Sequence, residues 1–354
     1  MAGRTAVGLD IGTSAVRAAE MSLAKRPATL VRFGQIALPS GAVRAGEVID
    51  TDVVAKVIRT LWSQVGFSTK KVVLGVANAK VVVRQVDLPW MPATELRRSL
   101  AFQVGDFVPM PIEETLLDVH VLHEYVGESG KRLMRVLLVA ALRPMVESLL
   151  EAVGKAGLTA TSVDLTSFAV LRALSGLDTL SLTDQAEALV DIGANVTNIV
   201  VHKQGVPSFV RILLMGGDDI TGAVAERLGI PHEQAELVKV EQGLSGAGYE
   251  GPDVHPATRV IASGAAELVE EVRGSLDYYL TQANAQPLGR ITLSGGGGQL
   301  TGLDAWLSAA TRLPVERAEP MAALRIGKVG LSPEQIEQVR PLAAVPLGLA
   351  MGAV

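Results

Sequence analysis

The sequence predicts an α/β protein made of two similar halves, and three observations support this prediction. Apolar stretches with the character of strands alternate with segments that place apolar residues at helical spacing. Hydrophobic residues make up 48% of the 354 residues, with 36 glycines and few aromatic residues, which is typical of a packed α/β protein. The tripeptide Asp-Ile-Gly begins at residue 10 and again at residue 191, about half a chain later. Since this length exceeds one ordinary hydrophobic core, the repeat indicates two domains of related structure.

The first half opens on a predicted meander of three strands, at residues 5–11, 14–22 and 29–38. Asp52 is interpreted as the N-cap of the helix that follows, because apolar residues at helical spacing run on to Val65 and Gly66 ends the pattern. Residues 72–77 then form a buried strand. These elements are expected to build the core of the first domain.

The segment 79–157 differs in character and is predicted to be a compact unit inserted into the first domain. Its three strands are expected at 81–89, 116–125 and 132–142, with the turn Gly-Glu-Ser-Gly between the last two. Pro92 opens a helix whose apolar face runs to Phe107 and Val108, and Pro109 and Pro111 stop it. Pro144 opens a second helix, which Gly157 ends.

The rest of the chain returns to the alternation of strands and helices. Residues 158–165 resume the first sheet, and a helix follows through Leu174. The polar, turn-rich segment 175–187 is the predicted domain boundary. The second half is predicted to contain strands within 187–213, helices at 218–229, 231–242 and 257–284, a strand within 291–300 that ends in four glycines, and a last helix from Ser332.

Composition excludes several classes of protein. The chain has no cysteine, which rules out disulfides and cysteine-based metal sites. Its net charge of −5, with both signs spread along the chain, differs from the basic surface of a nucleic-acid-binding protein. The N-terminus has no apolar segment typical of a signal peptide, and no apolar run reaches the roughly 18–20 residues of a membrane-spanning helix. We therefore expect a soluble, cytoplasmic protein with no nucleic-acid partner and no direct membrane insertion.

The two Asp-Ile-Gly turns predict a site for a metal-bound polyphosphate. A carboxylate at the end of an apolar strand is costly unless a ligand or partner compensates it. Glycine lets the backbone approach a ligand, and successive N–H groups in such a turn attract anions. Mg²⁺ favours one or two carboxylates together with phosphate oxygens. The alternative is that each aspartate only caps its own turn. The residues assigned to this site are Asp10, Gly12, Thr13, Ser14, Asp191, Gly193, Asn195 and Thr197.

Two further glycine-rich turns are candidates for the nucleoside side of the same cleft. Gly216 and Gly217 precede a predicted helix, and the run 294–298 follows a predicted strand. A glycine run at the end of a strand permits close approach of a ligand. Either turn alone would be weak support, since many glycine runs are ordinary loops.

These segments resemble the phosphate and adenosine motifs of the superfamily of ATPases that includes actin, heat-shock chaperones and sugar kinases. The resemblance rests on GLDIGTSAVRAAE, LVDIGANVTNIVV, MGGDDIT and ITLSGGGGQLTGL. The inserted segment VDLPWMPATELRRSLAFQVGDFVPMPIEETLLDVHVL (86–122) is similar to the subdomain found in PilM and FtsA. The sequence of this segment most resembles the PilM family, a family of actin-like ATPases that is related to FtsA and acts in type IV pilus assembly.

The resemblance implies an actin-like ATPase fold, in which two ribonuclease-H-like domains enclose a cleft that holds ATP and Mg²⁺. It implies a first domain at 1–184 with an inserted subdomain at about 79–157, a second domain at 185–330, and a C-terminal segment at 331–354 that returns to the first domain. Asp10 and Asp191 would hold the metal. The residues implied to contact the nucleotide are Gly12, Thr13, Ser14, Arg17, Gly193, Asn195, Thr197, Gly216, Gly217, Glu236, Lys239, Ser294, Gly295, Gly296 and Gly297. For Arg17, the wet face of a strand is the open alternative. For Glu236 and Lys239 it is a surface pair one helical turn apart.

Catalysis is expected to be weak. Hydrolytic relatives carry a Glu or Gln that orients water after the last strand of the first half. Here Asp164 is the only candidate for that role, and the implied catalytic residues are Asp10, Asp191 and Asp164. At most a slow ATPase is expected, with the nucleotide acting mainly as a conformational ligand.

The resemblance also implies a partner, the cytoplasmic N-terminal peptide of the membrane protein PilN. It would lie in a groove between the inserted subdomain and the first domain, and the chain would be held at the inner membrane through this and other pilus assembly proteins. Candidate groove residues are Arg84, Arg97, Arg98 and Phe102, although for each residue taken singly a solvated helix face with a core aromatic is the preferred interpretation. Self-association, an FtsA-like or MreB-like filament, and a carbohydrate-type kinase are the alternative functions.

Overall fold

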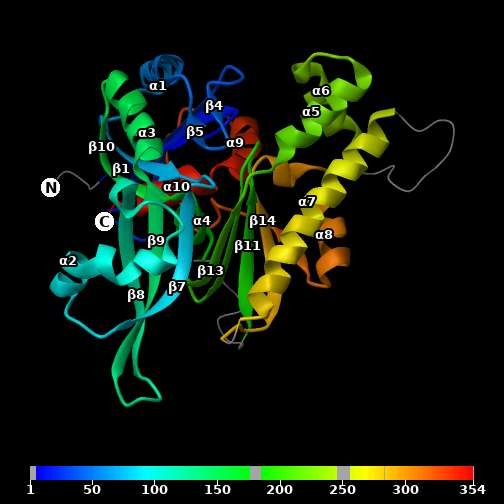
Figure 1. Cartoon of the computed structure of the whole chain (residues 1–354). Helices are drawn as coiled ribbons and strands as arrows, with labels where there is room; N and C mark the ends of the chain where they lie inside the picture. Colours follow the sequence, from blue (N-terminus) through cyan, green and yellow to red (C-terminus); the bar gives the residue numbers. More distant parts are fainter. Residues whose placement is uncertain (1–4, 176–184, 245–255, 283, 354) are drawn as a thin grey trace.

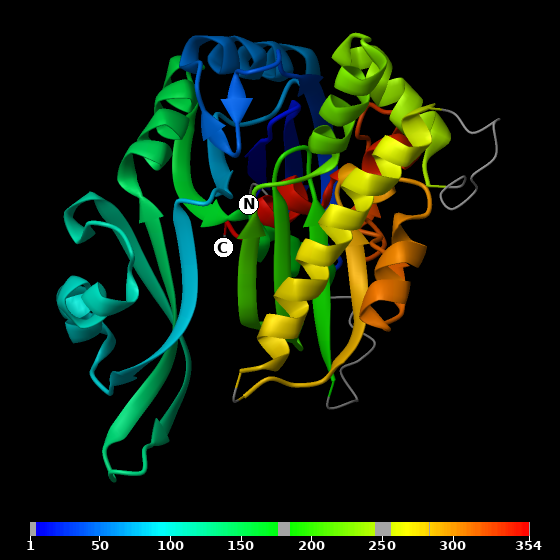
Figure 2. The same ribbon diagram turned by 45° about the vertical axis from the view of Figure 1, so that its right-hand side comes forward.

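The computed structural model describes residues 5–175, 185–244, 256–282 and 284–353. Two halves, each built on one sheet, face each other across the molecule, and a third, smaller sheet projects from the first half (Figures 1 and 2). The chain passes from the first half to the second and then returns, because its last helix packs back on the first sheet.

The first sheet begins with the predicted meander of antiparallel strands, and parallel strands extend it. β1 pairs with β2 on one side and with β6 on the other. Its strands, in spatial order, are β10 (Thr159–Leu165), β6 (Lys71–Val76), β1 (Thr5–Ile11), β2 (Ala15–Ser22), β3 (Thr29–Ala37) and β16 (Arg325–Ile326).

The second sheet repeats this plan. β11 pairs antiparallel with β12 and parallel with β14, as β1 does with β2 and β6. Its strands, in spatial order, are β13 (Val206–Leu213), β12 (Thr197–Lys203), β11 (Ala186–Ile192), β14 (Leu288–Ser294) and β15 (Val315–Arg317). The shared plan explains why one tripeptide occurs twice.

Ten described helices cover the sheets. They are α1 (Thr51–Val65), α2 (Ala93–Val104), α3 (Arg143–Lys155), α4 (Thr166–Leu174), α5 (Gly217–Leu228), α6 (His232–Gln242), α7 (Pro256–Leu280), α8 (Leu303–Thr311), α9 (Pro333–Val339) and α10 (Ala344–Met351). Single 3-10 turns lie at Gly105–Phe107, Ile112–Glu114, Gly297–Gln299 and Arg340–Leu342. Within the described residues, no helix combines the length and the apolar character needed to cross a bilayer.

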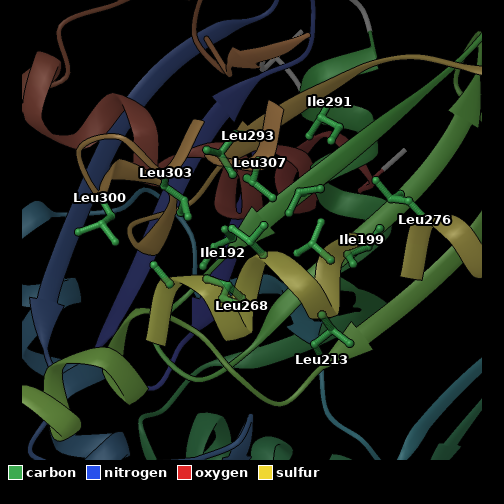
Figure 3. Packing of buried hydrophobic residues seen from close by; sticks show 14 of the residues in the cluster. Ile192, Ile199, Leu213, Leu268, Leu276, Ile291, Leu293, Leu300, Leu303 and Leu307 are labelled. Carbon is green, nitrogen blue, oxygen red and sulfur yellow. The ribbon is translucent and has the colours of Figure 1, made fainter. Parts of the chain in front are cut away.

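The core of the second half lies between its sheet and the helices α7 and α8. Figure 3 shows Ile192, Ile199 and Ile291 from the sheet packed with Leu268 from α7 and Leu303 from α8. Since Ile192 points into this core, the neighbouring residue Asp191 points to the other side of the strand. The hydrophobic packing therefore fixes the direction of the carboxylate.

Helix α10 closes the core of the first half. Pro346 and Leu349 lie so near β1 that a Cβ atom on Gly8 would be 2.1 Å from the Pro346 carbonyl oxygen. The glycine in this strand is thus explained by a close helix–strand approach.

The inserted subdomain is a three-stranded antiparallel sheet covered by α2. Its order is β7 (Val81–Pro89), β9 (Arg132–Leu142) and β8 (Thr115–Val126). Leu96, Leu100 and Val104 of α2 are buried against Val136 and Leu138 of β9. The following helix, α3, packs instead on α1 and shares the hydrophobic core of the first sheet.

Several local predictions need correction. The N-cap of α1 is Asp50, not Asp52, because the Asp50 carboxylate accepts hydrogen bonds from the backbone of Asp52 and Val53. Helix α2 ends at Val104, five residues before Pro109, and Phe107 belongs to a separate 3-10 turn. Helix α7 ends at Leu280. Most of the predicted domain boundary 175–187 lies outside the described residues.

Candidate functional site

A cavity of about 1050 Å³ lies between the two sheets, where the carboxyl ends of β1 and β11 meet. Its volume is at the upper end of the range for small-molecule sites. Both halves of the chain line it, the first with Asp10 and its turn, the second with Asp191 and its turn. The repeat thus brings two chain segments 181 residues apart to one place.

The two turns have the same hydrogen bonding. The Gly12 N–H donates to the Ala15 carbonyl at 3.0 Å, and the Gly193 N–H donates to the Val196 carbonyl at 2.9 Å. The strand pairings also correspond, since Asp10 lies opposite Arg17 and Asp191 lies opposite Asn198. Two equivalent hairpins therefore present their aspartates to one cavity.

Both aspartates are held in an environment that disfavours their charge. Burial raises the pKa of Asp10 to about 6, against the nearby charge of Arg17, and the Asp191 carboxylate adds to the rise. Burial also raises the pKa of Asp191, against a hydrogen bond from Ser294 and the charge of Arg17. Ser294 Oγ donates to the Asp191 carboxylate at 2.6 Å. Arg17 Nη1 lies 3.7 Å from the Asp10 carboxylate.

The position of Arg17 has a different occupant in the second half. Asn198 is buried, and its side-chain oxygen accepts a hydrogen bond of 2.9 Å from Ser167 Oγ of α4. Arg17 Nε, by contrast, is buried without a hydrogen-bond partner among the described residues. The first hairpin therefore supplies a positive charge to the cavity, and the second supplies a neutral contact to α4.

The glycine-rich turns close the second half's side of the cavity by direct backbone contact. The N–H groups of Gly217 and Asp218 donate to the carbonyls of Gly193 and Ala194, at 3.0 and 2.8 Å. A Cβ atom on Gly216 would be 2.4 Å from the Ala194 carbonyl oxygen. Gly295 has a φ of +84°, and a Cβ there would be 2.3 Å from the Ile192 carbonyl oxygen. Glycine is required at these points by close packing of three backbones.

Glu236 and Lys239 of α6 form a partly buried pair that reaches the start of α5. Lys239 Nζ lies 2.7 Å from the Glu236 carboxylate and donates to the Gly217 carbonyl at 2.9 Å and to Thr221 Oγ1 at 2.8 Å. Lys239 is 7% exposed. The surface-pair alternative is therefore wrong for Lys239.

The residues of this cavity fit a divalent cation with a polyphosphate. The partly buried carboxylate of Asp10 and the buried carboxylate of Asp191 face the cavity, and the raised pKa of each reflects charge that lacks full compensation. The described residues contain no cluster of three or more side chains suited to bind a metal alone. Mg²⁺ needs no such cluster when phosphate oxygens and water supply its other ligands.

Most predicted site residues line the cavity. They are Asp10, Gly12, Thr13, Ser14, Arg17, Asp191, Gly193, Asn195, Gly217, Glu236, Lys239, Gly295, Gly296 and Gly297. Thr197, Gly216 and Ser294 lie one layer behind. Thr197 Oγ1 donates to the Met215 carbonyl at 2.9 Å, and the Gly216 N–H donates to the Asp219 carboxylate at 2.7 Å.

Asp164 lies elsewhere. It does not line the cavity, its carboxylate pairs with Arg172, and it accepts a hydrogen bond from the Leu165 N–H. This placement differs from the expectation that Asp164 orients a water molecule. Thr166, two residues later, does line the cavity.

Sequence reasoning missed several residues that line the cavity. Arg44 and Gly46 reach it from a short hairpin of β4 (Val43–Arg44) and β5 (Glu47–Val48). His232 lies at the rim, with Nε2 2.7 Å from the Asp218 carboxylate. Asn198 could have been found by adding the repeat distance to Arg17, but the hairpin carried no motif that would signal its position.

The candidate groove residues lie on the inserted subdomain. Arg84 is an exposed residue of β7, and Arg97, Arg98 and Phe102 are exposed on α2. Phe102 is 89% exposed, so the alternative of a core aromatic is wrong. Their role in binding a peptide stays a prediction.

A protein-family model matches nearly the whole chain. The family model described as type IV pilus assembly protein PilM matches residues 8–354. Among curated proteins, the chain is 26% identical over 262 residues to the cell division protein FtsA of Bacillus subtilis, which covers 67% of this chain and 58% of that relative. The chain thus spans little more than half the length of this relative. It is 25% identical over 351 residues to FtsA of Neisseria meningitidis, covering 88% and 83%.

Solved structures show the same fold. The chain superposes on a PilM-PilN type IV pilus biogenesis complex with a TM-score of 0.85 and 28% identity, covering 98% of both chains. MreB5 of Spiroplasma citri, solved with AMPPNP, gives a TM-score of 0.56 at 13% identity, covering 99% and 96%. At that identity the second likeness concerns the fold alone, and both place the chain among actin-like folds, as predicted.

Proposed function

Because the chain belongs to the PilM family of type IV pilus assembly proteins, we propose that it is an ATP-binding, actin-like scaffold of the pilus assembly complex. In this proposal it works on the cytoplasmic side of the inner membrane, where it binds the N-terminal cytoplasmic peptide of a PilN-type protein. Other inner-membrane assembly proteins and further copies of the chain are additional partners.

The nucleotide part of the proposal is carried by one observation, the two aspartates with raised pKa values that equivalent hairpins present to one cavity. In the proposed complex, Asp10 and Asp191 hold Mg²⁺ through its water shell, and the turns at Gly12 and Gly193 contact phosphates. Lys239 and the turns at Gly217 and Gly295 lie on the nucleoside side. The metal would neutralise phosphate charge, and these residues would orient the nucleotide.

Turnover is proposed to be slow at most. The acidic candidate for orienting water, Asp164, is engaged by Arg172 and does not line the cavity. Thr166 and Ser167 are the polar residues at the corresponding start of α4, and neither is a strong general base. The nucleotide then serves mainly to set the conformation of the protein.

The partner part of the proposal is supported by the similarity to a PilM-PilN complex over 98% of both chains. The inserted subdomain offers an exposed aromatic, Phe102, beside the basic residues Arg97 and Arg98. Exposed aromatic and arginine side chains are frequent anchors at protein interfaces. The chain would be held near the membrane by this partner.

Calorimetry with a synthetic PilN-type N-terminal peptide tests the partner part, with and without ATP and Mg²⁺. Binding in at least one state is expected, and no heat in either state would refute the scaffold role. Phe102→Ala is expected to weaken peptide binding about tenfold or more if Phe102 is an anchor. Leu237→Ala is the matched control, because Leu237 is also an exposed apolar residue but lies on α6, away from the inserted subdomain.

An FtsA-like filament is a second candidate function, favoured by the curated relatives. Sedimentation with and without ATP, in the presence and absence of lipid vesicles, distinguishes the two functions. Pelleting that depends on nucleotide would support the filament. Turnover of a sugar in a kinase assay would instead support the third, enzymatic alternative.

A further inference from the structure

The hairpin of β4 and β5, labelled in Figure 1, carries an arginine that lines the cavity and that the nucleotide site described so far does not use. Arg44 lines the cavity and is exposed. The other two lysines and arginines of the lining are both engaged, Arg17 with Asp10 and Lys239 with Glu236. Among the residues that the structure describes, the Arg44 guanidinium has no ion-pair or hydrogen-bond partner.

The charge of the cavity gives Arg44 a chemical role. Carboxylates outnumber cations in the lining, where Asp218, Asp219 and Glu233 join the acidic residues of the site. The carboxylates repel the negative charge of a polyphosphate, so each cation in the lining contributes to the binding of its phosphate groups. A guanidinium matches the oxygens of a phosphate with two parallel hydrogen bonds, and an arginine without a partner is free to do so.

The hairpin that carries Arg44 is fastened at its tip. Ala45 and Gly46 have φ angles of +49° and +77°, the conformation of a type I′ turn. A Cβ atom on Gly46 would be 1.9 Å from the Ala77 carbonyl oxygen, so the tip lies directly on the chain after β6. Asn78 Nδ2 donates to the Ala45 carbonyl at 2.5 Å, and Asn78 is 3% exposed.

The same contacts reach the neck of the inserted subdomain, defined here as residues 77–81 and 142, where the chain enters and leaves it. The Asn78 side-chain oxygen accepts from the Lys80 N–H at 2.8 Å, and the Lys80 carbonyl accepts from the Leu142 N–H at 3.1 Å. Lys80 Nζ also binds the Glu47 carboxylate of β5 at 2.7 Å. Both strands that connect the subdomain to the first domain are therefore bonded, directly or through one residue, to the hairpin.

We propose that Arg44 binds the terminal phosphate of the nucleotide and that the hairpin 43–48 passes this contact to the neck of the inserted subdomain. The proposal rests on the proposed nucleotide site and adds its regulation. Loss of the terminal phosphate frees Arg44, and the neck loses the order that the anchored hairpin gives it. ATP and ADP then leave the inserted subdomain in different states.

Calorimetry with Mg²⁺ and either ATP or ADP tests the phosphate contact. Arg44→Ala is expected to weaken ATP binding about 10- to 100-fold, the range for a charged hydrogen bond, and to change ADP binding less than threefold. Arg44→Lys should restore part of the loss. Arg227→Ala, which removes an exposed arginine outside the cavity, is the control and should leave both affinities unchanged. Equal ATP affinity in Arg44→Ala and wild type would overturn the proposal.

Hydrogen exchange of the full chain tests the passage to the neck. ATP with Mg²⁺ is expected to slow exchange at the neck and the adjoining strand ends, residues 77–84 and 140–142, severalfold more than ADP does. Asn78→Ala should keep ATP affinity and lose this difference, and Glu47→Gln, a milder change on the surface, should reduce it. Wild type that binds ATP without any difference at the neck would overturn the proposal alone. Wild type that binds neither nucleotide would refute the nucleotide site itself.

Discussion

At the residue scale, Asp10 illustrates how a binding site costs stability. Its carboxylate is desolvated in the unliganded chain, and Arg17 at 3.7 Å compensates it only in part. The neighbouring residues Leu9 and Ile11 are buried in the core, so the strand that carries Asp10 is held in place and the carboxylate does not move out into water. The same burial makes the position suited to a hydrated cation, because the attraction between the carboxylate and a metal ion is weakly screened there.

We predict that Asp10→Asn stabilises the unliganded chain at neutral pH. The pKa of Asp10 is about 6 in the folded state and lies near 3.8 in the unfolded state. The folded state therefore binds more protons between these values, so stability falls as pH rises from about 4 to 6 and stays lower above that. At 1.36 kcal/mol per pKa unit, the gain in Asp10→Asn is at most about 3 kcal/mol, reduced by the partner that Arg17 loses.

Urea unfolding of wild type and Asp10→Asn at pH 4 and pH 7.5 measures this effect. The two proteins should differ little at pH 4 and clearly at pH 7.5. Asp106→Asn, at an exposed position in the inserted subdomain, is the control. A variant that is less stable than wild type at pH 7.5 would contradict the prediction.

At the element scale, the start of α1 depends on one aspartate of a nearby pair. Asp50 Oδ1 accepts from the N–H groups of Asp52 and Val53 at 3.1 and 3.0 Å. Asp52 lies in the first turn and pairs at the surface with Lys155. Asp50→Ala should lower the free energy of unfolding by about 1 kcal/mol, the usual cost of a lost N-cap. Asp52→Ala should cost less in the same chemical denaturation experiment, and the reverse order would show that the cap is misassigned.

A second prediction at this scale concerns the turn after β14. Gly295 and Gly229 both have positive φ, at +84° and +64°, but only Gly295 is pressed against another backbone, at Ile192. Gly229→Ala should cost about 1–2 kcal/mol for its φ alone. Gly295→Ala should cost several times more, because the Cβ atom has no space. Calorimetric unfolding of both variants checks this, and similar losses would mean that the three backbones at the cavity are not rigidly packed.

At the scale of the whole molecule, the features predicted from the sequence were those that an internal repeat or a regular spacing of apolar residues indicates. The Asp-Ile-Gly repeat led to two related sheets with Asp10 and Asp191 in one cavity, because equivalent strands end at equivalent places. The sequence did not predict the hairpin at Arg44 or the pairing of Asp164 with Arg172. A strand of two residues is too short to show an alternation of apolar and polar residues. The position of this hairpin depends instead on contacts between distant residues, such as Gly46 and Ala77. Asp164 has a local partner, Arg172, two helical turns along the chain, and no periodic pattern reports such a pair.

The whole-molecule prediction is that Mg²⁺ and ATP bind the two halves to each other. A ligand that binds only the folded chain adds about 2.7 kcal/mol at a concentration one hundred times its Kd, so the Tm should rise with ATP and Mg²⁺. Asp10→Asn and Asp191→Asn should each lose most of this rise, since one carboxylate of each half faces the metal. Asp10→Asn should then show a higher Tm than wild type without ligand and a smaller response to it.

Thermal unfolding with ATP and Mg²⁺, ATP and EDTA, or buffer alone separates the possible results. ATP in EDTA should give little rise, because six carboxylates in the lining repel the phosphates when no metal is present. Asp118→Asn, on an exposed strand of the inserted subdomain, should respond as wild type does. If both aspartate variants showed the full rise in Tm with ATP and Mg²⁺, Asp10 and Asp191 would only cap their own turns and would not bind the metal. The two halves would then be held together by α4 and α10, whose apolar residues pack with strands of both sheets, without a shared metal.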